Sequence, residues 1–243
     1  MYPSSNLPSG IPGEPHPQYE RPAQPPIWKR YPPVSSAILA VCVVVFLAEM
    51  LLPDLRTSVI QGQQVPLQKG ALYGPAVGLG EWWRILATVF AHGNALHILF
   101  NMMVLVSLGM PLEKQLGTVR FIMVSLVTAL GSSAMVLWFN FMQPTVGASG
   151  MILGWAGVMI PLINRQARRS MGVWLVQIAI ISLLPGVSWA GHLGGLLAGI
   201  PCGLLLRDRS GRAFWAVTPV LLIALGVVCW LAVGRGMAPL YAG

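Results

Sequence analysis

Apolar residues form seven segments separated by short polar connections. The segments lie at about 34–52, 94–112, 119–141, 149–164, 171–184, 190–206 and 214–234. A helix needs about 20 apolar residues, within a range of about 17–25, to cross a bilayer, so the segments 149–164 and 171–184 are short. Only helices and closed barrels span a membrane, and the length of these runs favours helices. The pattern predicts an all-α, polytopic membrane helix bundle with seven spans.

Lysine and arginine gather in alternate connections. If the N-terminus lies inside, eleven basic residues lie inside as well: Arg21, Lys29, Arg30, Lys114, Arg120, Arg165, Arg168, Arg169, Arg207, Arg209 and Arg212. Four lie outside: Arg56, Lys69, Arg84 and Arg235. Because short cytoplasmic loops carry an excess of basic residues, this asymmetry predicts that the N-terminus is inside.

The composition agrees with a membrane protein. Hydrophobic residues make up 55% of the 243 and charged residues only 9%, against about 25% charged in soluble domains. The net charge of +8 comes from short clusters between apolar segments, so we read it as a topology signal and expect no nucleic-acid partner. Cys42, Cys202 and Cys229 lie in apolar segments without metal-ligand or CxxC spacing. We expect neither a metal nor a cofactor.

Residues 1–33 differ from the rest of the chain. They contain ten of the 20 prolines and few aliphatic residues, so they cannot build a core. No apolar segment preceded by basic residues stands at the N-terminus, and we expect no cleaved signal peptide. We predict a disordered, proline-rich cytoplasmic tail.

Four polar residues lie in or beside the apolar segments: Ser149, His192, His97 and Asn101. Polar and ionisable groups are costly inside a membrane, where they favour a functional role. In the predicted topology Ser149 and His192 lie at the outer ends of their helices, and His97 and Asn101 lie in the outer half of theirs. Three separate stretches of chain are therefore expected to converge at one depth.

Glycines recur at every fourth position on the two helices that carry Ser149 and His192. They are Gly191, Gly195, Gly199 and Gly203 on one helix and Gly150 and Gly154 on the other. Small residues at this spacing let helix backbones approach closely in lipid. Ordinary helix packing would explain the glycines alone, but close contact would also let a short serine side chain reach a histidine on the neighbouring helix.

A serine hydroxyl becomes nucleophilic when a base such as neutral imidazole removes its proton. No aspartate or glutamate lies in the outer halves of the three helices that carry the four residues, so we predict a Ser149–His192 dyad rather than a triad. His97 and Asn101 are four residues apart and share a helix face. Both side chains, and the backbone N–H of Ser149, could donate to an oxyanion; the alternative for His97 and Asn101 is an interhelical polar clamp.

The chain resembles the rhomboid intramembrane serine proteases from about Pro33 to Leu206. The matching stretches are Trp83-Arg84, His97-Ile-Leu-Phe-Asn101, Gly147-Ala-Ser149-Gly150, and His192 followed by Gly195 and Gly199. The resemblance implies a six-helix protease core over 34–206. Residues 207–243 would then form an extra transmembrane helix and a short outer tail.

The same resemblance implies a role for each matching residue. Ser149 would be the nucleophile and His192 the general base, with His97, Asn101 and the Ser149 N–H lining the oxyanion hole. Trp83 and Arg84 would belong to a membrane-embedded loop, Glu113 would be structural, and His92 would support a water-containing interior. Four residues after the serine stands Leu153, where some members have an aromatic residue that stacks on the histidine.

The implied substrates are single-span transmembrane proteins, cut near the outer face of the membrane. The short segment 171–184, with its bulky Trp174, Leu175 and Ile178, suits a loosely held, lipid-contacting helix, and the resemblance assigns it to substrate entry. A bacterial cytoplasmic membrane is the expected location, and the oligomeric state stays open. The alternatives are a rhomboid-like protein that binds membrane clients without cutting them and a small transporter.

Overall fold

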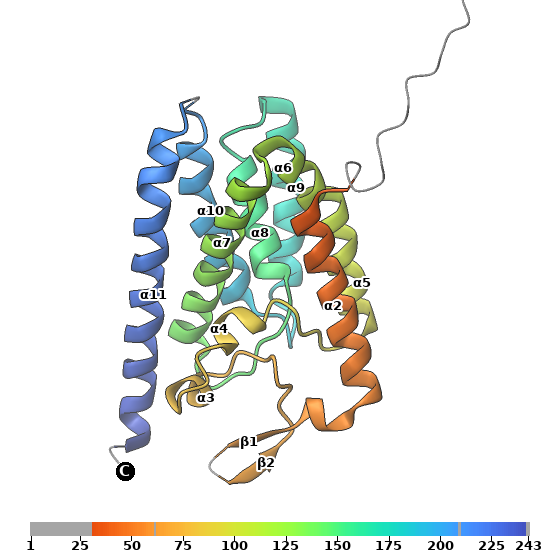
Figure 1. The fold of residues 1–243 in the computed structure, drawn as a ribbon, viewed down its shortest axis with the longest axis vertical. Helices are drawn as coiled ribbons and strands as arrows, with labels where there is room; N and C mark the ends of the chain where they lie inside the picture. Colours follow the sequence, from red (N-terminus) through yellow and green to blue (C-terminus); the bar gives the residue numbers. More distant parts are fainter. Residues whose placement is uncertain (1–30, 61, 209, 242–243) are drawn as a thin grey trace, which may run out of the picture.

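The computed structural model describes residues 31–60, 62–208 and 210–241 (Figure 1). Nearly all of the tail predicted for residues 1–33 lies outside these ranges. Long helices stand side by side, and the chain enters the bundle at one end and leaves it at the other (Figure 1).

In the part of the chain that the structure describes, seven helical runs cross the bundle in alternating directions, which confirms the predicted all-α, polytopic membrane fold. They are α2 (Pro33–Leu51), α5 (Ala95–Val104) continued by a π-helical turn (Leu105–Gly109) and α6 (Met110–Leu116), α7 (Thr118–Phe139), α8 (Ser149–Met159), α9 (Arg165–Ile181), α10 (Trp189–Leu205) and α11 (Arg212–Tyr241). Within the described residues, four helices are long and apolar enough to cross a membrane: α2, the run Ala95–Leu116, α7 and α11. The apolar helices α8 and α10 are shorter.

Two predicted boundaries were wrong. Helix α8 ends at Met159 rather than at 164, and α9 begins at Arg165 rather than at 171. The Asn164 side chain accepts a hydrogen bond from the Ala167 N–H at 2.9 Å, so it caps α9 before the apolar segment starts. At about 1.5 Å per residue, the 11 residues of α8 span roughly 16 Å of a ~30 Å hydrocarbon core. The helix can therefore reach one membrane surface but not both.

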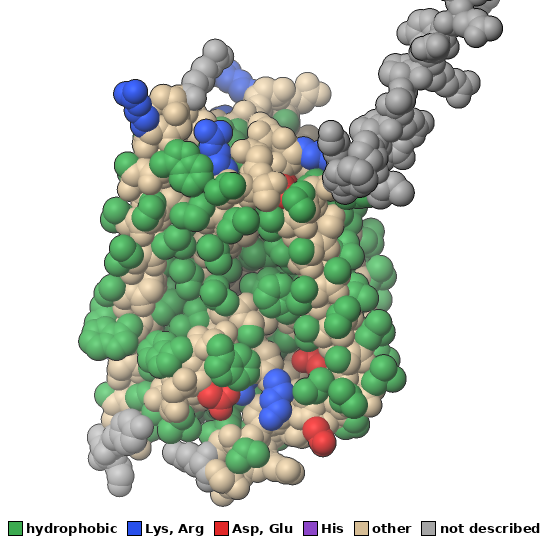
Figure 2. Space-filling model, in the orientation of Figure 1, with side chains coloured by type: hydrophobic (Ala, Val, Ile, Leu, Met, Phe, Trp, Pro, Cys, Tyr) green, Lys and Arg blue, Asp and Glu red, His purple; other side chains and the backbone are tan. Residues whose placement is uncertain are grey.

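The surface changes character along the bundle axis. Hydrophobic side chains cover the middle of the face seen in Figure 2, and lysines and arginines gather at the end where α2 and α7 begin. Arg165, Arg168 and Arg169 lie in the first turns of α9, Arg207 follows the end of α10, and Arg212 begins α11, all at this end. A broad apolar belt with a basic rim is the surface expected of a membrane-spanning bundle.

The connection between α2 and α5 contains short elements that the apolar pattern did not predict. They are a 3₁₀ turn (Pro53–Arg56), the antiparallel strands β1 (Ser58–Ile60) and β2 (Gln63–Val65), and the short helices α3 (Gly74–Gly78) and α4 (Arg84–Ala87). Each is too short to show a helical or strand period in sequence. They lie together at the end of the bundle opposite the basic rim (Figure 1).

Arg84 holds this connection together. Its side chain is only 1% exposed and forms an ion pair with Glu81 at 2.6 Å. The guanidinium also donates to the Ser58 hydroxyl and to three backbone carbonyls, those of Gln68 (3.0 Å), Lys69 (2.7 Å) and Ala71 (2.9 Å). A buried arginine is stable only when its donors are satisfied. The loop therefore folds around one cation.

Glu113 plays the corresponding part at the opposite end of the bundle. Its buried carboxylate accepts hydrogen bonds from the N–H groups of Val34 (3.0 Å) and Ser35 (2.7 Å) and from the Ser35 hydroxyl (2.7 Å). The first N–H groups of a helix have no acceptor within that helix. Glu113 caps α2 from α6, which ties the first span to the second.

Glycine brings α8 and α10 into backbone contact, as the spacing of the glycines predicted. A Cβ atom built on Gly195 would overlap the carbonyl group of Gly150, and one on Gly199 would overlap that of Gly154. Only glycine fits at these crossings because two main chains occupy the space that a side chain would need.

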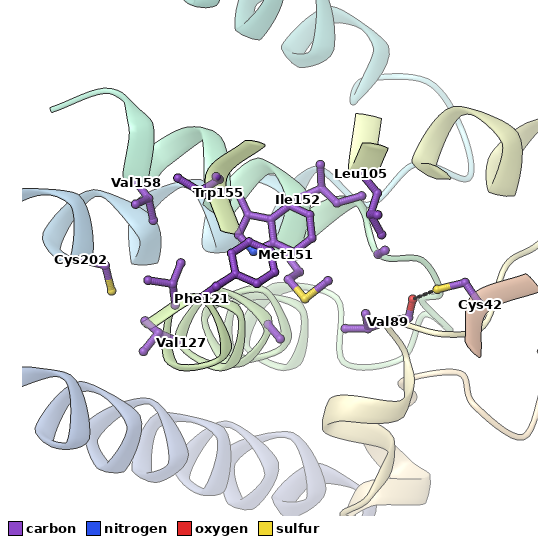
Figure 3. Close-up of a cluster of buried hydrophobic side chains, with 14 of the residues drawn as sticks. Cys42, Val89, Leu105, Phe121, Val127, Met151, Ile152, Trp155, Val158 and Cys202 are labelled. Atoms are coloured by element: carbon purple, nitrogen blue, oxygen red, sulfur yellow. Dashed lines mark hydrogen bonds between the residues drawn. The ribbon is translucent and has the colours of Figure 1, made fainter. Parts of the chain in front are cut away.

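Larger side chains fill the space beside this contact. The rings of Phe121 on α7 and Trp155 on α8 lie 4.9 Å apart, and the indole N–H donates to the Ser125 hydroxyl at 3.0 Å. Figure 3 shows both rings among the buried residues that join α7, α8 and α10. Close packing here fixes the position of α8 in the bundle.

Replacing Arg84 with lysine should destabilise the protein. An ammonium group keeps the charge but cannot reach all of the acceptors that the planar guanidinium holds, so the free energy of unfolding should fall by on the order of 3 kcal/mol. Thermal unfolding in detergent micelles would measure this loss as a lower Tm. The matched control is Arg56→Lys at an exposed position of the same connection, and equal Tm values for the two variants would contradict the role given to Arg84.

A single methyl group should be enough to disturb the α8–α10 contact. Gly199→Ala should lower the free energy of unfolding by about 1–3 kcal/mol because the backbones must separate. Gly226→Ala, in α11 where nothing lies within 4 Å of the added atom, should leave stability unchanged or raise it by up to about 1 kcal/mol. Thermal unfolding of both variants tests the contact, which would be refuted if Gly199→Ala were as stable as Gly226→Ala.

Candidate active site

Ser149 and His192 meet where α8 and α10 begin. The Ser149 Oγ lies 2.8 Å from the His192 Nε2, and both residues are partly buried. Ser149 is the first residue of α8, and His192 stands in the first turn of α10. The glycine contacts in the following turns of α8 and α10 hold the two backbones close enough for the short serine side chain to reach the ring.

The other nitrogen of His192 has a partner that the sequence did not suggest. The Ser182 Oγ lies 2.6 Å from the His192 Nδ1. Ser182 is the C-cap of α9 and is 7% exposed. In sequence it is one polar residue at the end of an apolar segment, and no local pattern places it beside a residue of α10.

His97 and Asn101 lie on α5 and face this pair. The side chain of Asn94 caps α5 by accepting from the His97 N–H at 2.9 Å. The Asn101 amide donates one hydrogen to the His97 carbonyl at 2.8 Å, which leaves its second N–H available. The His97 Nδ1 accepts a long hydrogen bond, 3.4 Å, from the Gly93 N–H, so a neutral His97 ring carries its proton on Nε2.

Gly147 lets the backbone that leads to Ser149 pass close to the His97 ring. Its φ angle is +121°, which side chains rarely tolerate, and a Cβ atom there would lie 2.7 Å from the His97 Nε2. The Gly147 N–H donates to the Thr88 carbonyl at 2.9 Å, and Thr145 pairs with Leu72. The connection before α8 is thus fastened to the loop that Arg84 organises.

His92 is fully buried beside His97, with the two ring centroids 5.1 Å apart. It lies in the connection between α4 and α5, where its Nδ1 is 3.2 Å from the Phe90 carbonyl. Its Nε2 has no hydrogen-bond partner among the described residues. Burial, and secondarily the neighbouring His97, lowers the pKa of His92 to about 4. The ring is neutral at pH 7.

Asn101, Ser149 and His192 line one partly open cavity of about 100 Å³ between α5, α8 and α9. Its other walls are formed by Phe100, Val104, Ile152, Leu153, Trp174 and Ile178. A second cavity of about 210 Å³ lies between α8, α9 and α10 and is also bordered by Leu153 and His192. Leu153 thus borders both cavities together with the histidine. Trp174, Leu175 and Ile178 are partly buried against these cavities. The large exposed hydrophobic residues of α9 are Val173, Val176, Ile180 and Ile181.

The remaining predicted residues do not line the cavity that Asn101, Ser149 and His192 share. Trp83 is 51% exposed, and the Arg84 guanidinium lies 4.7 Å from the centre of its ring. Arg84 and Glu113 are the buried ends of the two networks described above. Gly150, Gly195 and Gly199 belong to the α8–α10 contact.

Residues 79–209 match the Rhomboid domain, a stretch that includes Ser149, His192, His97 and Asn101. Rhomboid protease GluP of Bacillus subtilis is 33% identical over 168 residues, which cover 65% of this chain and 33% of GluP. RHOMBOID-like protein 5 of Arabidopsis thaliana is 31% identical over 180 residues, covering 68% of this chain and 58% of that protein. Rhomboid-like protease 1 of Toxoplasma gondii is 27% identical over 220 residues, covering 81% and 74%. The aligned part of the chain corresponds to about a third of GluP and little more than half of the Arabidopsis protein.

Proposed function

Because this chain belongs to the rhomboid family, we propose that it is an intramembrane serine endopeptidase with Ser149 and His192 as its catalytic dyad. The observation that carries this proposal is the 2.8 Å contact between the Ser149 Oγ and the His192 Nε2. Hydrogen-bond distance between a nucleophile and a base is what general-base activation of serine requires.

In the first half of the reaction, the Ser149 Oγ attacks the carbonyl carbon of the scissile peptide while the His192 Nε2 takes the hydroxyl proton. The tetrahedral intermediate then collapses, the C–N bond breaks, and His192 returns the proton to the departing amine. In the second half, water attacks the acyl-enzyme with His192 again as the base, and Ser149 is regenerated.

Three donors surround the position where the oxyanion forms. The second N–H of the Asn101 amide is free of the His97 carbonyl. The His97 Nε2 lies beside Gly147, and the Ser149 N–H opens α8 without an acceptor in its helix. Donors fixed before the reaction stabilise the developing charge without reorganisation. His92, neutral and packed on His97, holds that ring in place.

The cavity beside the dyad suits an apolar polypeptide that arrives from the membrane. Apart from the dyad and Asn101, the residues lining it are apolar, and it lies between α9 and α5. We assign to it segments of single-span transmembrane proteins, which unwind next to Ser149 before cleavage. Residues 34–206 form the protease core and 207–243 add the seventh helix.

The basic rim sets the orientation of the enzyme. We place the rim in the cytoplasm, the N-terminus on the same side, and the dyad toward the outer face of a bacterial cytoplasmic membrane. No metal or cofactor takes part in this mechanism.

Removing either member of the dyad should abolish proteolysis. Ser149→Ala and His192→Ala should each reduce cleavage of a transmembrane reporter in proteoliposomes to background, and the double variant should be no worse because the two residues act as a unit. A fluorophosphonate should label the native protein and not Ser149→Ala, with unchanged Tm as the control for folding. Substantial cleavage by Ser149→Ala would refute the dyad, and a folded native protein that binds clients but neither cuts nor reacts would favour the non-catalytic alternative.

Asn101→Ala tests the oxyanion hole. Its donor acts mainly in the transition state, so kcat should fall about 10²–10³-fold while KM changes little. Gln177→Ala removes an exposed amide from α9 and should leave both constants unchanged. An Asn101 effect confined to KM would instead make this side chain a substrate-binding group.

A further inference from the structure

Ser182 has two short polar contacts and only one proton to share between them. Its Oγ lies 2.6 Å from the Ile178 carbonyl oxygen and 2.6 Å from the His192 Nδ1. A carbonyl oxygen can only accept a hydrogen bond. The Ser182 proton must therefore point toward Ile178, because two oxygen atoms at this distance attract only through a hydrogen between them.

This assignment fixes the proton on the histidine. With its own proton engaged, the Ser182 Oγ can only accept from the ring, so the His192 Nδ1 carries a hydrogen. In neutral imidazole the other nitrogen then has a lone pair. That nitrogen, Nε2, is the atom that faces the Ser149 hydroxyl.

We propose that Ser182 is the positioning residue of the site: its hydroxyl holds His192 in the tautomer and ring orientation that let Nε2 act as the base toward Ser149. The inference rests on the proposed function and adds a third member to the dyad. Ser182 does not touch the reacting atoms and acts only through the histidine. It takes the place that a carboxylate occupies in a serine protease triad, where it orients the ring through Nδ1.

The end of α9 also suits the charge that His192 acquires during the reaction. Ser182 is the C-cap of this 17-residue helix, and its N–H donates to the same Ile178 carbonyl at 2.8 Å. The C-terminal end of a helix carries partial negative charge, which stabilises a nearby cation. The imidazolium formed when Ser149 attacks thus meets both a hydroxyl acceptor and the negative end of α9.

A pair of variants of equal shape isolates the hydroxyl. Ser182→Thr keeps an acceptor, and Ser182→Val has nearly the same volume without one. The Val variant should lose about 10-fold to 100-fold in kcat relative to Thr, the range expected for a hydrogen bond to a charged group, with little change in KM. Cleavage of the transmembrane reporter in proteoliposomes measures both constants. Equal kcat values for Thr and Val would overturn the proposal.

A spectroscopic readout tests the tautomer directly and needs no variant at Ser182. The protein labelled with ¹⁵N-histidine, in micelles at about pH 8, should show His192 protonated at Nδ1, and its signals can be assigned by their absence in His192→Ala. In Ser182→Val the resonances should move toward the Nε2-protonated form, and in Ser182→Thr they should stay. A native His192 protonated at Nε2 would overturn the proposal.

The same experiments separate this proposal from the proposed function. Ser149→Ala leaves Ser182 in place, so His192 should still be protonated at Nδ1 in this variant, although the variant cannot cleave substrate. If Ser149→Ala retained proteolysis, the dyad would fail whatever the spectra show. If Ser149→Ala were inactive and Ser182→Val matched Ser182→Thr in rate and spectrum, the dyad would stand and Ser182 would be a packing residue.

Discussion

The contact between the backbones of α8 and α10 determines the geometry of the whole site. In lipid, helices gain little from burying apolar surface against one another, so van der Waals contact and polar pairs must hold them together. Gly195 against Gly150, and Gly199 against Gly154, bring the main chains as close as they can come. The serine has a short side chain and the histidine a rigid one, so their hydrogen bond exists only because the helices touch.

Two buried charges fix the parts of the chain that the glycines do not reach. Arg84 gathers four backbone or side-chain oxygen acceptors besides Glu81 and so gives shape to a loop with little regular structure. Thr88 and Leu72 of this loop in turn form hydrogen bonds with Thr145, in the segment that leads into α8. Glu113 supplies the missing acceptors at the start of α2. Each charge is stable in the interior because its donors or acceptors have hydrogen-bond partners.

The sequence was sufficient to predict the helical runs, apart from the bounds of α8 and α9, and the proximity of Ser149 to His192. Long apolar runs mark membrane helices directly, and the alternation of basic connections brings Ser149, His192 and Asn101 to one end of the bundle. Side-chain periodicity also predicted the glycine contact between α8 and α10. These features depend on local composition and spacing, which a single sequence displays.

Most of the features that escaped prediction depend on contacts between residues that are distant in the sequence. The hairpin and short helices after α2 are held by Arg84 rather than by their own propensities. The start of α9 is set by the Asn164 cap, which outweighs the polar character of its first turn. Ser182 reaches His192 only because the end of α9 packs beside the start of α10. The lack of a nearby carboxylate predicted a dyad and gave no sign of this serine.

The four-residue spacing of the glycines limits how α8 can move along α10. A slide of one or two residues would drive side chains into the opposite backbone, since the small positions recur only once per turn. The next register in which glycines oppose each other again is four residues away, or about 6 Å. Packed interfaces of this kind have discrete arrangements rather than a continuous range. The distance between Ser149 and His192 is therefore either short enough for a hydrogen bond or several ångströms too long. The packing does not permit small shifts of α8 along α10 that would lengthen this distance gradually.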